Sequence, residues 1–300
     1  MTKQRLILAI GIPIALVLSL AFGVTVMERP VSADPGSHYY VNWATGNDGN
    51  DGTSGSPWKT ISHAADNVPA GTSAIDPNVI HVADGTYDNT NNGASFPITF
   101  DQENVSLVAN STGAIIDQEF LVTGTGTILK IEATGITING FTLDNAGYGI
   151  MANVGGFNII NNTFSNDTDY DIYYGVYVNI TECNLTDDFS FDPILIEDND
   201  FNITIEGVHI RLDIDFDHLE TNLDIDIGDI GVFDNDFNMD TTYGVDIDIG
   251  VSDVDSGNVT VGDIDVSDGN TFTDGDCGVY FDSYLHNLDD ATVTIGELMI

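Results

Sequence analysis

Hydrophobic and polar residues alternate one by one through much of the second half of the chain. The segment YGVDIDIGVSDVDSGNVTVGDIDV, residues 243–266, places aspartate between isoleucine or valine for most of its length. This alternation indicates β-strands with one buried face, because neighbouring side chains of a strand point to opposite sides. Glycine, asparagine and aspartate interrupt the alternation at intervals, as expected for turns. The pattern predicts short strands joined by turns and excludes helical repeats.

A motif of asparagine followed by phenylalanine recurs in the same half. It reads INNTF at 160–164, DNDF at 198–201, DNDF at 234–237 and GNTF at 269–272. Its asparagines are at positions 162, 199, 235 and 270, so the spacing is 37, 36 and then 35 residues. A period of this length is typical of a solenoid or a propeller. Each unit holds about three strands, fewer than a propeller blade needs, so we predict a single-stranded right-handed parallel β-helix.

Aligning the repeats predicts which side chains stack on one another from coil to coil. A strand in each unit contains glycine followed by valine, and the residues after this glycine alternate between core and surface. We expect inward rows of Val176, Val208, Val245 and Val279, and of Val178, Ile210, Ile247 and Phe281. The matching outward ladders are Tyr177, His209, Asp246 and Tyr280, and Asn179, Arg211, Asp248 and Asp282.

The repeated asparagines are predicted to lie at a turn. Asparagine tolerates the left-handed backbone conformation there, and its amide can bond to the next coil. The phenylalanine two residues later is predicted to be core. A second outward face is expected to stack Asp224 with Asn258 and Thr292, Asp226 with Thr260 and Thr294, and Asp229 with Asp263 and Glu297.

The N-terminal third carries a resemblance to a known superfamily. The stretch YYVNWATGNDGNDGTSGSPWKTISHAADNVPAG (39–71), followed by NVIHVADGTY (78–87), resembles the start of secreted β-helix proteins of the pectate-lyase-like superfamily. The resemblance implies a short strand, a Gly/Asp loop and a helix that caps the solenoid. In that helix Thr60 is the expected N-cap, and the apolar face is Ile61, Ala64, Ala65 and Val68. We therefore expect a cap at residues 34–74 and coils at 75–300.

The first residues are typical of an export signal. Lys3 and Arg5 precede an apolar run from Leu6 to about Val26, and Val31-Ser32-Ala33 matches a small-residue cleavage pattern. We predict a signal peptide at residues 1–33, or alternatively an uncleaved signal anchor. The chain is thus expected at the cell surface or outside the cell. Eight Asn-x-Ser/Thr sequons add a prediction of glycosylation: Asn104, Asn110, Asn161, Asn166, Asn179, Asn184, Asn202 and Asn258.

Charge narrows the range of partners. The 48 acidic and 6 basic residues give a net charge of −42, which repels nucleic acid and anionic membrane surfaces. We expect no nucleic-acid partner and no organic cofactor. Aspartate supplies 39 of the acids, and its short carboxylate ligates hard cations, so Ca²⁺ is the expected cofactor. Adaptation to a salty medium is the alternative explanation.

Catalytic candidates lie on the first outward face. Lyases of the superfamily that this chain resembles use calcium and a Lys or Arg base. The resemblance therefore implies Arg211, beside His209, as the candidate base. A salt bridge of Arg211 with nearby acids is the simpler interpretation. A glycoside hydrolase needs two carboxylates. Asp246 and Asp248 would lie about 7 Å apart along a strand, and Asp248 and Asp282 about 5 Å apart across coils.

A structural or binding role is the leading interpretation. We predict an exported structural, adhesive or polysaccharide-binding protein, with a calcium-assisted lyase or hydrolase acting on acidic glycans as the alternative. Polysaccharide or cell-envelope components are the expected partners. The segment at 291–300 would leave the last coil uncapped, so we expect either further sequence or end-to-end self-association. The predicted carbohydrate ligands are Tyr177, Tyr280 and Tyr284. The predicted metal ligands are Asp213, Asp224, Asp226, Asp229, Asp263 and Asp265.

Overall fold

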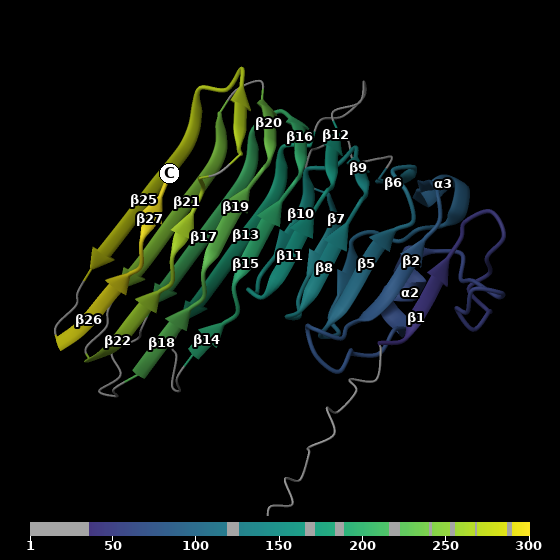
Figure 1. Cartoon of the computed structure of the whole chain (residues 1–300), viewed down its shortest axis with the longest axis horizontal. Coiled ribbons are helices and arrows are strands. Elements are labelled where there is room, and N and C mark those ends of the chain that lie inside the picture. The colour runs from purple at the N-terminus through teal and green to yellow at the C-terminus, as the bar shows by residue number, and fades with distance from the viewer. Residues whose placement is uncertain are drawn as a thin grey trace, which may run out of the picture. The chain divides into compact units, whose positions relative to one another are not determined.

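The computed structural model describes residues 36–300 except 119–125, 166–171, 184–188, 216–222, 240–241, 253–255, 268 and 287–289. The predicted export signal at residues 1–33 lies outside this part. Within it, every pair of neighbouring strands in the sheets is parallel, and strands adjacent in a sheet come from successive coils (Figure 1). The predicted right-handed parallel β-helix is thereby confirmed.

Four sheets form the walls of the coils, and we number them in chain order. Sheet 1 contains β1 (His38–Val41), β2 (Asn78–Val82), β5 (Val105–Ala109), β8 (Ile136–Asn139), β11 (Phe157–Ile160), β15 (Ile194–Glu197), β19 (Ile230–Phe233), β23 (Ile264–Asp265) and β27 (Leu298–Met299). Sheet 2 contains β3 (Gly85–Tyr87), β6 (Ala114–Asp117), β9 (Thr142–Asp144), β12 (Thr163–Ser165), β16 (Asp200–Ile203), β20 (Asp236–Met239) and β24 (Thr271–Thr273).

The remaining two sheets differ in length. Sheet 3 contains β4 (Ile98–Phe100), β7 (Thr127–Ile131), β10 (Tyr148–Ala152), β13 (Tyr174–Cys183), β17 (Glu206–Asp215), β21 (Tyr243–Ser252) and β25 (Cys277–His286). Sheet 4 contains β14 (Phe189–Phe191), β18 (Leu223–Ile227), β22 (Ser256–Val261) and β26 (Asp290–Ile295). Among the described residues, the fourth side of the coils therefore begins at β14.

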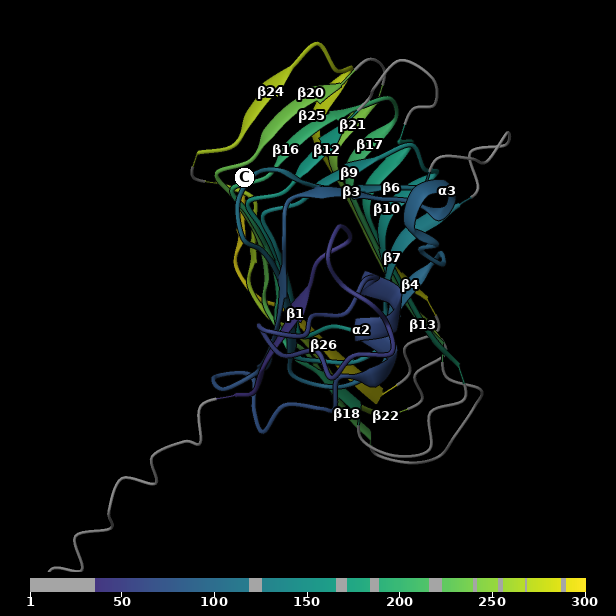
Figure 2. The same cartoon turned by 90° about the vertical axis from the view of Figure 1, so that its right-hand side faces the viewer.

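The N-terminal cap follows the prediction. Helix α2 (Ile61–Asn67) begins after Thr60, whose side chain accepts a hydrogen bond from the backbone N–H of His63 at 3.2 Å. Its apolar face of Ile61, Ala64 and Ala65 is buried. Figure 2 views the coils from this end and shows α2 lying in front of them. A second helix, α3 (Asn89–Asn92), is a single turn, and within the described part of the chain no helix has the length and hydropathy to cross a membrane.

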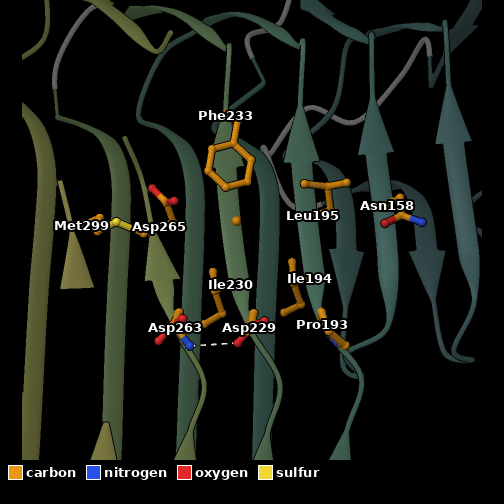
Figure 3. Close-up of a pocket in the computed structure, with 11 residues that line it drawn as sticks. Asn158, Pro193, Ile194, Leu195, Asp229, Ile230, Phe233, Asp263, Asp265 and Met299 are labelled. Carbon is orange, nitrogen blue, oxygen red and sulfur yellow. Dashed lines mark hydrogen bonds between the residues drawn. The ribbon is translucent and has the colours of Figure 1, made fainter. Parts of the chain in front are cut away.

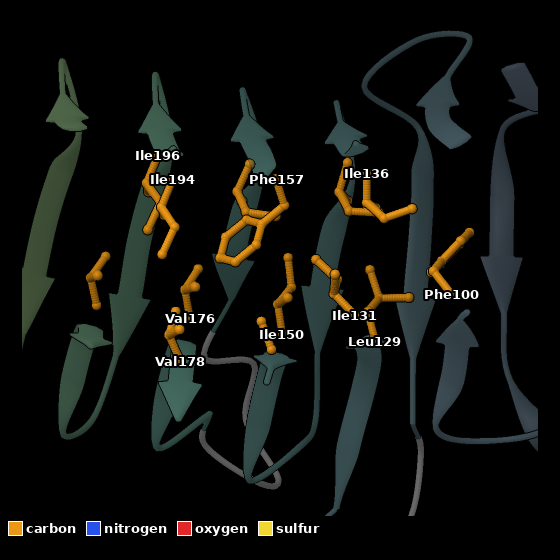
Figure 4. Packing of buried hydrophobic residues seen from close by; sticks show 14 of the residues in the cluster. Phe100, Leu129, Ile131, Ile136, Ile150, Phe157, Val176, Val178, Ile194 and Ile196 are labelled. Atoms are coloured by element: carbon orange, nitrogen blue, oxygen red, sulfur yellow. The ribbon is translucent and has the colours of Figure 1, made fainter. Parts of the chain in front are cut away.

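The core fills the space between the sheets. Figure 4 shows hydrophobic side chains of sheet 3, such as Val176 and Ile150, facing those of sheet 1, such as Ile194 and Phe157. The predicted inward rows are confirmed: Val176, Val208, Val245 and Val279 are paired in register, and the first three are fully buried. Phe164, Phe201, Phe237 and Phe272 stack with centroid separations of 4.6, 4.8 and 4.9 Å.

The repeated asparagines form a buried ladder rather than occupying the left-handed position. The backbone N–H of Asn162 donates to the side-chain oxygen of Asn199 at 2.9 Å, and Asn199 repeats this bond to Asn235 at 2.9 Å. The predicted amide bond to the next coil is therefore confirmed. The prediction of left-handed backbone at the ladder asparagines is wrong: positive φ falls one residue earlier, at Asn161, Asp198 and Asp234. The preceding residue makes the turn, which leaves the ladder asparagine free to point inward.

Candidate functional site

The outer face of sheet 3 brings together residues from neighbouring coils because the strand alternation is broken at glycine. Glu206 and His209 are three residues apart, a spacing that puts side chains on opposite faces of a regular strand. Here Gly207 and Val208 are both buried, so Glu206 and His209 meet on the outer side. Gly207 lies against the ring of Phe237, and a Cβ at this position would be 2.4 Å from two ring carbons. Only glycine fits, so the packing of the core fixes the arrangement of the surface.

Glu206, His209 and Asp246 form a compact cluster on β17 and β21. His209 Nδ1 is 2.6 Å from Glu206 Oε2 and 3.5 Å from Asp246 Oδ2. The exposed fractions of the three side chains are only 15% for His209, 11% for Glu206 and 9% for Asp246. Asp246 Oδ1 is buried and has no hydrogen-bond partner among the described residues. Two carboxylates thus converge on one imidazole in a nearly dry environment.

Burial and mutual charge change the acidity of these groups. Burial raises the pKa of Asp246, and the charge of the nearby His209 lowers it. The carboxylates of Asp248, Glu206 and Asp282 raise it further, and the pKa reaches about 6. For His209, burial alone would lower the pKa, but the hydrogen bond to Glu206 and the charges of Glu206, Asp246 and Asp248 outweigh it, and the pKa is raised. An imidazolium and a carboxyl group that titrates near neutrality therefore share this cluster.

Tyrosines surround the cluster. Tyr177 stacks on the His209 ring at a centroid distance of 5.1 Å, and Tyr174 meets the same ring edge-on at 6.1 Å. Tyr148 stacks on Tyr174 at 5.1 Å. On the other side, Tyr243 lies 5.1 Å from Tyr280, which pairs with Asp246 in the strand register and is 41% exposed. The result is an aromatic surface interrupted by one polar cluster.

The other sequence candidates on sheet 3 lie beside this cluster in a more exposed network. Arg211 is 50% exposed and its Nη2 is 3.1 Å from Asp213 Oδ2. Tyr284 lies over Gly250, where a Cβ would be 2.1 Å from the ring, and its hydroxyl donates to Asp213 Oδ1 at 2.8 Å. Asp248 and Asp282 are in register with Arg211 on the following strands, as the predicted ladder requires.

The predicted metal ligands are distributed over three sheets and the turns between them, and only Asp229, Asp263 and Asp265 line a common hollow. Asp213 lies on sheet 3, Asp224 and Asp226 on β18 of sheet 4, and Asp265 on β23 of sheet 1. Asp229 and Asp263 lie at the turns between sheets 4 and 1 and bond to backbone. Asp229 Oδ1 accepts the amide of Asp263 at 2.9 Å, and Asp263 Oδ1 accepts the amide of Glu297 at 2.7 Å. Among the described residues, the cluster of three donors that could hold one metal ion is Glu206, His209 and Asp246.

Two hollows of more than 400 Å³ occur on other faces of the described part of the chain. One of about 430 Å³ lies outside sheet 1, and Figure 3 shows Phe233 and Ile230 among its lining side chains together with Asp229 and Asp265. The other, of about 460 Å³, lies outside sheet 2 and is lined mainly by polar side chains, among them Asp200, Asn202, Asp236 and Asn238. Neither includes a residue of the His209 cluster.

Sequence reasoning did not select Glu206, Tyr148, Tyr174 or Tyr243. All four precede the glycine that recurs in the strands of sheet 3, in YGI, YGV, EGV and YGV. The recurring glycine was the available signal, because a glycine at the same place in successive strands indicates a local break in alternation.

The fold and this outer face define a parallel β-helix protein with an aromatic and acidic surface. Residues 44–274 match the model of a family described as protein of unknown function (DUF1565). The matched stretch covers more than half of the chain, so the chain belongs to that family. A comparison with curated proteins finds no match.

Solved structures with similar folds include two lyases and a methylesterase. A rhamnogalacturonan lyase is 17% identical, with a TM-score of 0.40, and the match covers 83% of this chain and 62% of that chain. The pectate lyase Pel9A is 14% identical, with a TM-score of 0.36 and coverage of 82% and 79%. A pectin methylesterase in complex with hexasaccharide VII is 13% identical, with a TM-score of 0.37 and coverage of 77% and 67%. At these identities the likeness concerns the fold, which the strand pairing establishes independently.

Proposed function

We propose that this protein is an exported, cell-surface or extracellular carbohydrate-binding β-helix whose glycan-binding surface is the outer face of sheet 3. The observation that carries the proposal is the aromatic surface of Tyr148, Tyr174, Tyr177, Tyr243 and Tyr280 around the polar cluster of His209. The apolar C–H faces of sugars pack on aromatic rings, and the tyrosine hydroxyls, carboxylates and imidazole offer hydrogen-bond partners to sugar hydroxyls.

Charge favours neutral glycans as ligands of this face. The chain carries a net charge of −42, and Glu206, Asp246, Asp248 and Asp282 surround the single arginine and the histidine of the site. A uronic-acid polymer would meet like charges here unless bound cations intervened. A neutral polysaccharide avoids this repulsion, so its binding should depend little on salt.

Calcium belongs to the proposal as a counterion of the exposed acidic ladders. Asp224, Asp226, Asp263 and Asp265 present carboxylates on sheets 1 and 4 and the turns between them, where a hard cation can be held through water. Sodium chloride at molar concentration should then stabilise the protein as calcium does, since both screen self-repulsion. Thermal unfolding in EDTA, in sodium chloride and in calcium chloride distinguishes charge screening from specific calcium binding. Rescue by micromolar calcium alone would indicate chelating sites.

A hydrolytic activity is the second candidate, and the raised pKa of Asp246 favours it. A carboxyl group with a pKa of about 6 is protonated often enough near neutral pH to act as a general acid. Asp248, two residues further along β21, would supply the second carboxylate. The lyase alternative fits less well: Arg211 is half-exposed and bonded to Asp213, whereas an arginine base would need a dry site that disfavours its charge.

Affinity electrophoresis through gels that contain neutral or uronic-acid polysaccharides tests the binding proposal. We expect retardation by at least one neutral polysaccharide, and at least about a fivefold weaker dissociation constant for Tyr280→Ala, since truncating an aromatic contact removes about 1 kcal/mol. Tyr40→Ala is the matched control, because Tyr40 is an aromatic residue of sheet 1. The proposal fails if no polysaccharide retards the protein, or if both variants lose binding equally.

Two further measurements test the remaining parts of the proposal. Release of reducing ends from the bound polysaccharide, abolished in Asp246→Asn, would establish the hydrolase, and intact polysaccharide would leave a binding protein. Mass spectrometry of the protein recovered from the medium tests export. We expect a mature chain that begins at Asp34, and retention of the full chain inside the cell would contradict export.

A further inference from the structure

We propose that Glu206, His209 and Asp246 bind one divalent transition-metal ion of the zinc type. This inference does not depend on glycan binding, because the three donors can bind a metal ion whether or not a sugar packs on the aromatic surface around them. The three donors come from two adjacent strands, β17 and β21, which are held in register by nine pairs of residues from Glu206–Tyr243 to Asp215–Ser252. The register between β17 and β21 therefore fixes the relative positions of the three donors.

The donor set selects the class of metal. One imidazole nitrogen and two carboxylate oxygens suit zinc and its neighbours, which combine nitrogen and oxygen ligands in four-coordinate sites. Calcium prefers six to eight oxygen ligands and rarely accepts a nitrogen. Three protein donors leave one position for a water molecule, and the partly exposed side of the cluster faces solvent.

The geometry is close to what such an ion requires. The three ligand atoms lie within 4.8 Å of one another, and His209 Nδ1 is 2.6 Å from Glu206 Oε2 and 3.5 Å from Asp246 Oδ2. Bonds of about 2.0–2.2 Å to a tetrahedral ion separate neighbouring donors by about 3.3 Å. The short contact must open by less than 1 Å, which a small rotation of the Glu206 side chain provides.

The unsatisfied charge of the cluster is the second observation that indicates a cation. Asp246 is nine-tenths buried, faces His209, and has one carboxylate oxygen with no hydrogen-bond partner among the described residues. A buried polar atom without a partner is destabilising. With protonated His209 the three groups still sum to one negative charge. A divalent ion bound by neutral His209 and two ionised carboxylates brings the sum to zero. It also provides a partner for the carboxylate of Asp246.

The surroundings would hold the imidazole in place. Tyr177 stacks on one side of the His209 ring and Tyr174 meets it edge-on, so the ring has little freedom to turn. Metal-binding histidines are usually fixed in this way by neighbouring groups. The exposed acidic ladder of sheet 4 offers no comparable arrangement, because its paired residues Asp224, Asn258 and Thr292 include one carboxylate and no histidine.

Isothermal titration of the purified, EDTA-treated protein with zinc chloride tests the proposal. We expect one zinc ion per chain at micromolar concentration or below, and visible absorption of four-coordinate Co²⁺ when cobalt replaces zinc. His209→Ala should weaken binding at least about tenfold, as loss of a ligand does. His286→Ala is the matched control, because His286 is an exposed histidine at the end of β25 in the same sheet.

Each result decides the question. One saturable zinc site that is lost in His209→Ala and kept in His286→Ala supports the proposal, provided that millimolar calcium does not compete. Absence of saturable zinc binding in the unaltered protein overturns it, as does binding that survives His209→Ala. If His209→Ala fails to fold, as circular dichroism would show, Asp246→Asn serves as the second variant. Because the titration contains no polysaccharide, its failure would leave the glycan-binding proposal untouched.

Discussion

The outer faces of sheets 3 and 4 both carry aspartates but place these carboxylates in different surroundings. On sheet 3, Asp246 is nine-tenths buried beside His209 and Glu206. On sheet 4, Asp224 and Asp226 are exposed, and Asp224 Oδ1 accepts a hydrogen bond from Asn258 Nδ2 at 2.8 Å. In both sheets a strand alternates aspartate with isoleucine, β21 in sheet 3 and β18 in sheet 4. The local break at Gly207 and the tyrosines of sheet 3 account for the difference.

Burial and partners, rather than the number of acids, therefore give a carboxylate a distinctive chemistry. An exposed carboxylate on sheet 4 interacts with water and diffusing ions, and its removal should change little. A buried one on sheet 3 depends on its neighbours for compensation. Four changes test this contrast, and they are ordered here by the size of the expected effect.

Removal of Glu206 should have the largest effect. In EDTA-containing buffer at neutral pH, Glu206→Ala should lower the free energy of unfolding by about 2 kcal/mol, because His209 loses a short hydrogen bond and a buried ion-pair partner. Asp226→Ala on sheet 4 should change it by less than about 0.5 kcal/mol. Urea unfolding followed by circular dichroism measures both. Equal effects of the two substitutions would remove the distinction between the faces.

Neutralising Asp246 should raise the free energy of unfolding instead of lowering it. Its pKa of about 6 in the folded protein lies above the ordinary value of 3.8, so the folded state holds this proton more tightly than the unfolded chain. The stabilising contribution is complete below about pH 4 and is lost as the pH rises toward 6. Asp246→Asn keeps the neutral form, so without metal it should be more stable than the unaltered protein at neutral pH, by about 1 kcal/mol.

The pH dependence provides the control for this second prediction. The advantage of Asp246→Asn should shrink as the pH falls from about 7.5 to about 5, because Asp246 itself becomes protonated. His209 changes the stability in the same direction. Because its pKa is raised above the ordinary value of 6.5, its stabilising contribution is complete below about pH 6.5 and is lost as the pH rises through the folded-state pKa. An advantage independent of pH would show that the carboxylate is not the cause.

The turn aspartates between sheets 4 and 1 should give an intermediate effect. Asp263→Ala removes the acceptor for the backbone amide of Glu297 and should destabilise the protein by about 1 kcal/mol. Asp263→Asn keeps a side-chain oxygen and should recover most of this stability. Melting temperatures in EDTA and in calcium chloride measure both. If Asp263 instead chelated calcium, Asp263→Asn would behave like Asp263→Ala, and only in the presence of calcium.

The strands of sheet 3 show where the sequence was sufficient to predict the structure and where it was not. Alternation and the repeat spacing predicted the coils and the stacking of Val176 on Val208, because burial imposes period two over every strand. The capping helix at Ile61 was implied by the resemblance of residues 39–87 to secreted β-helix proteins. The same rule hid the pairing of Glu206 with His209, since it assigns residues three apart to opposite faces. Gly207 breaks the rule, and the reason is a phenylalanine ring from the next coil.

A second limit concerns what a carboxylate bonds to. Asp229 and Asp263 resemble metal ligands in sequence because each is an acid in a repeated outward position. In the structure each accepts a backbone amide from the following coil, which satisfies that amide without a cation. Sequence lists the acids but does not say which amide faces them. The shift of positive φ from Asn162 to Asn161 is a similar error of one residue at a turn.

The smallest effect is expected for the exposed pair on sheet 4. Asn258 Nδ2 donates to Asp224 Oδ1 at 2.8 Å across neighbouring coils, yet both side chains are exposed to water, which replaces a lost partner readily. A double-mutant cycle of Asp224→Ala and Asn258→Ala should therefore give a coupling below about 0.5 kcal/mol. The corresponding cycle of Glu206→Ala and Asp246→Ala should give a clearly larger coupling, because the two residues share His209. If the sheet 4 pair coupled as strongly, regular stacking of exposed side chains would itself be a major source of stability. The contrast between the two faces would then have to be attributed to the tyrosines alone.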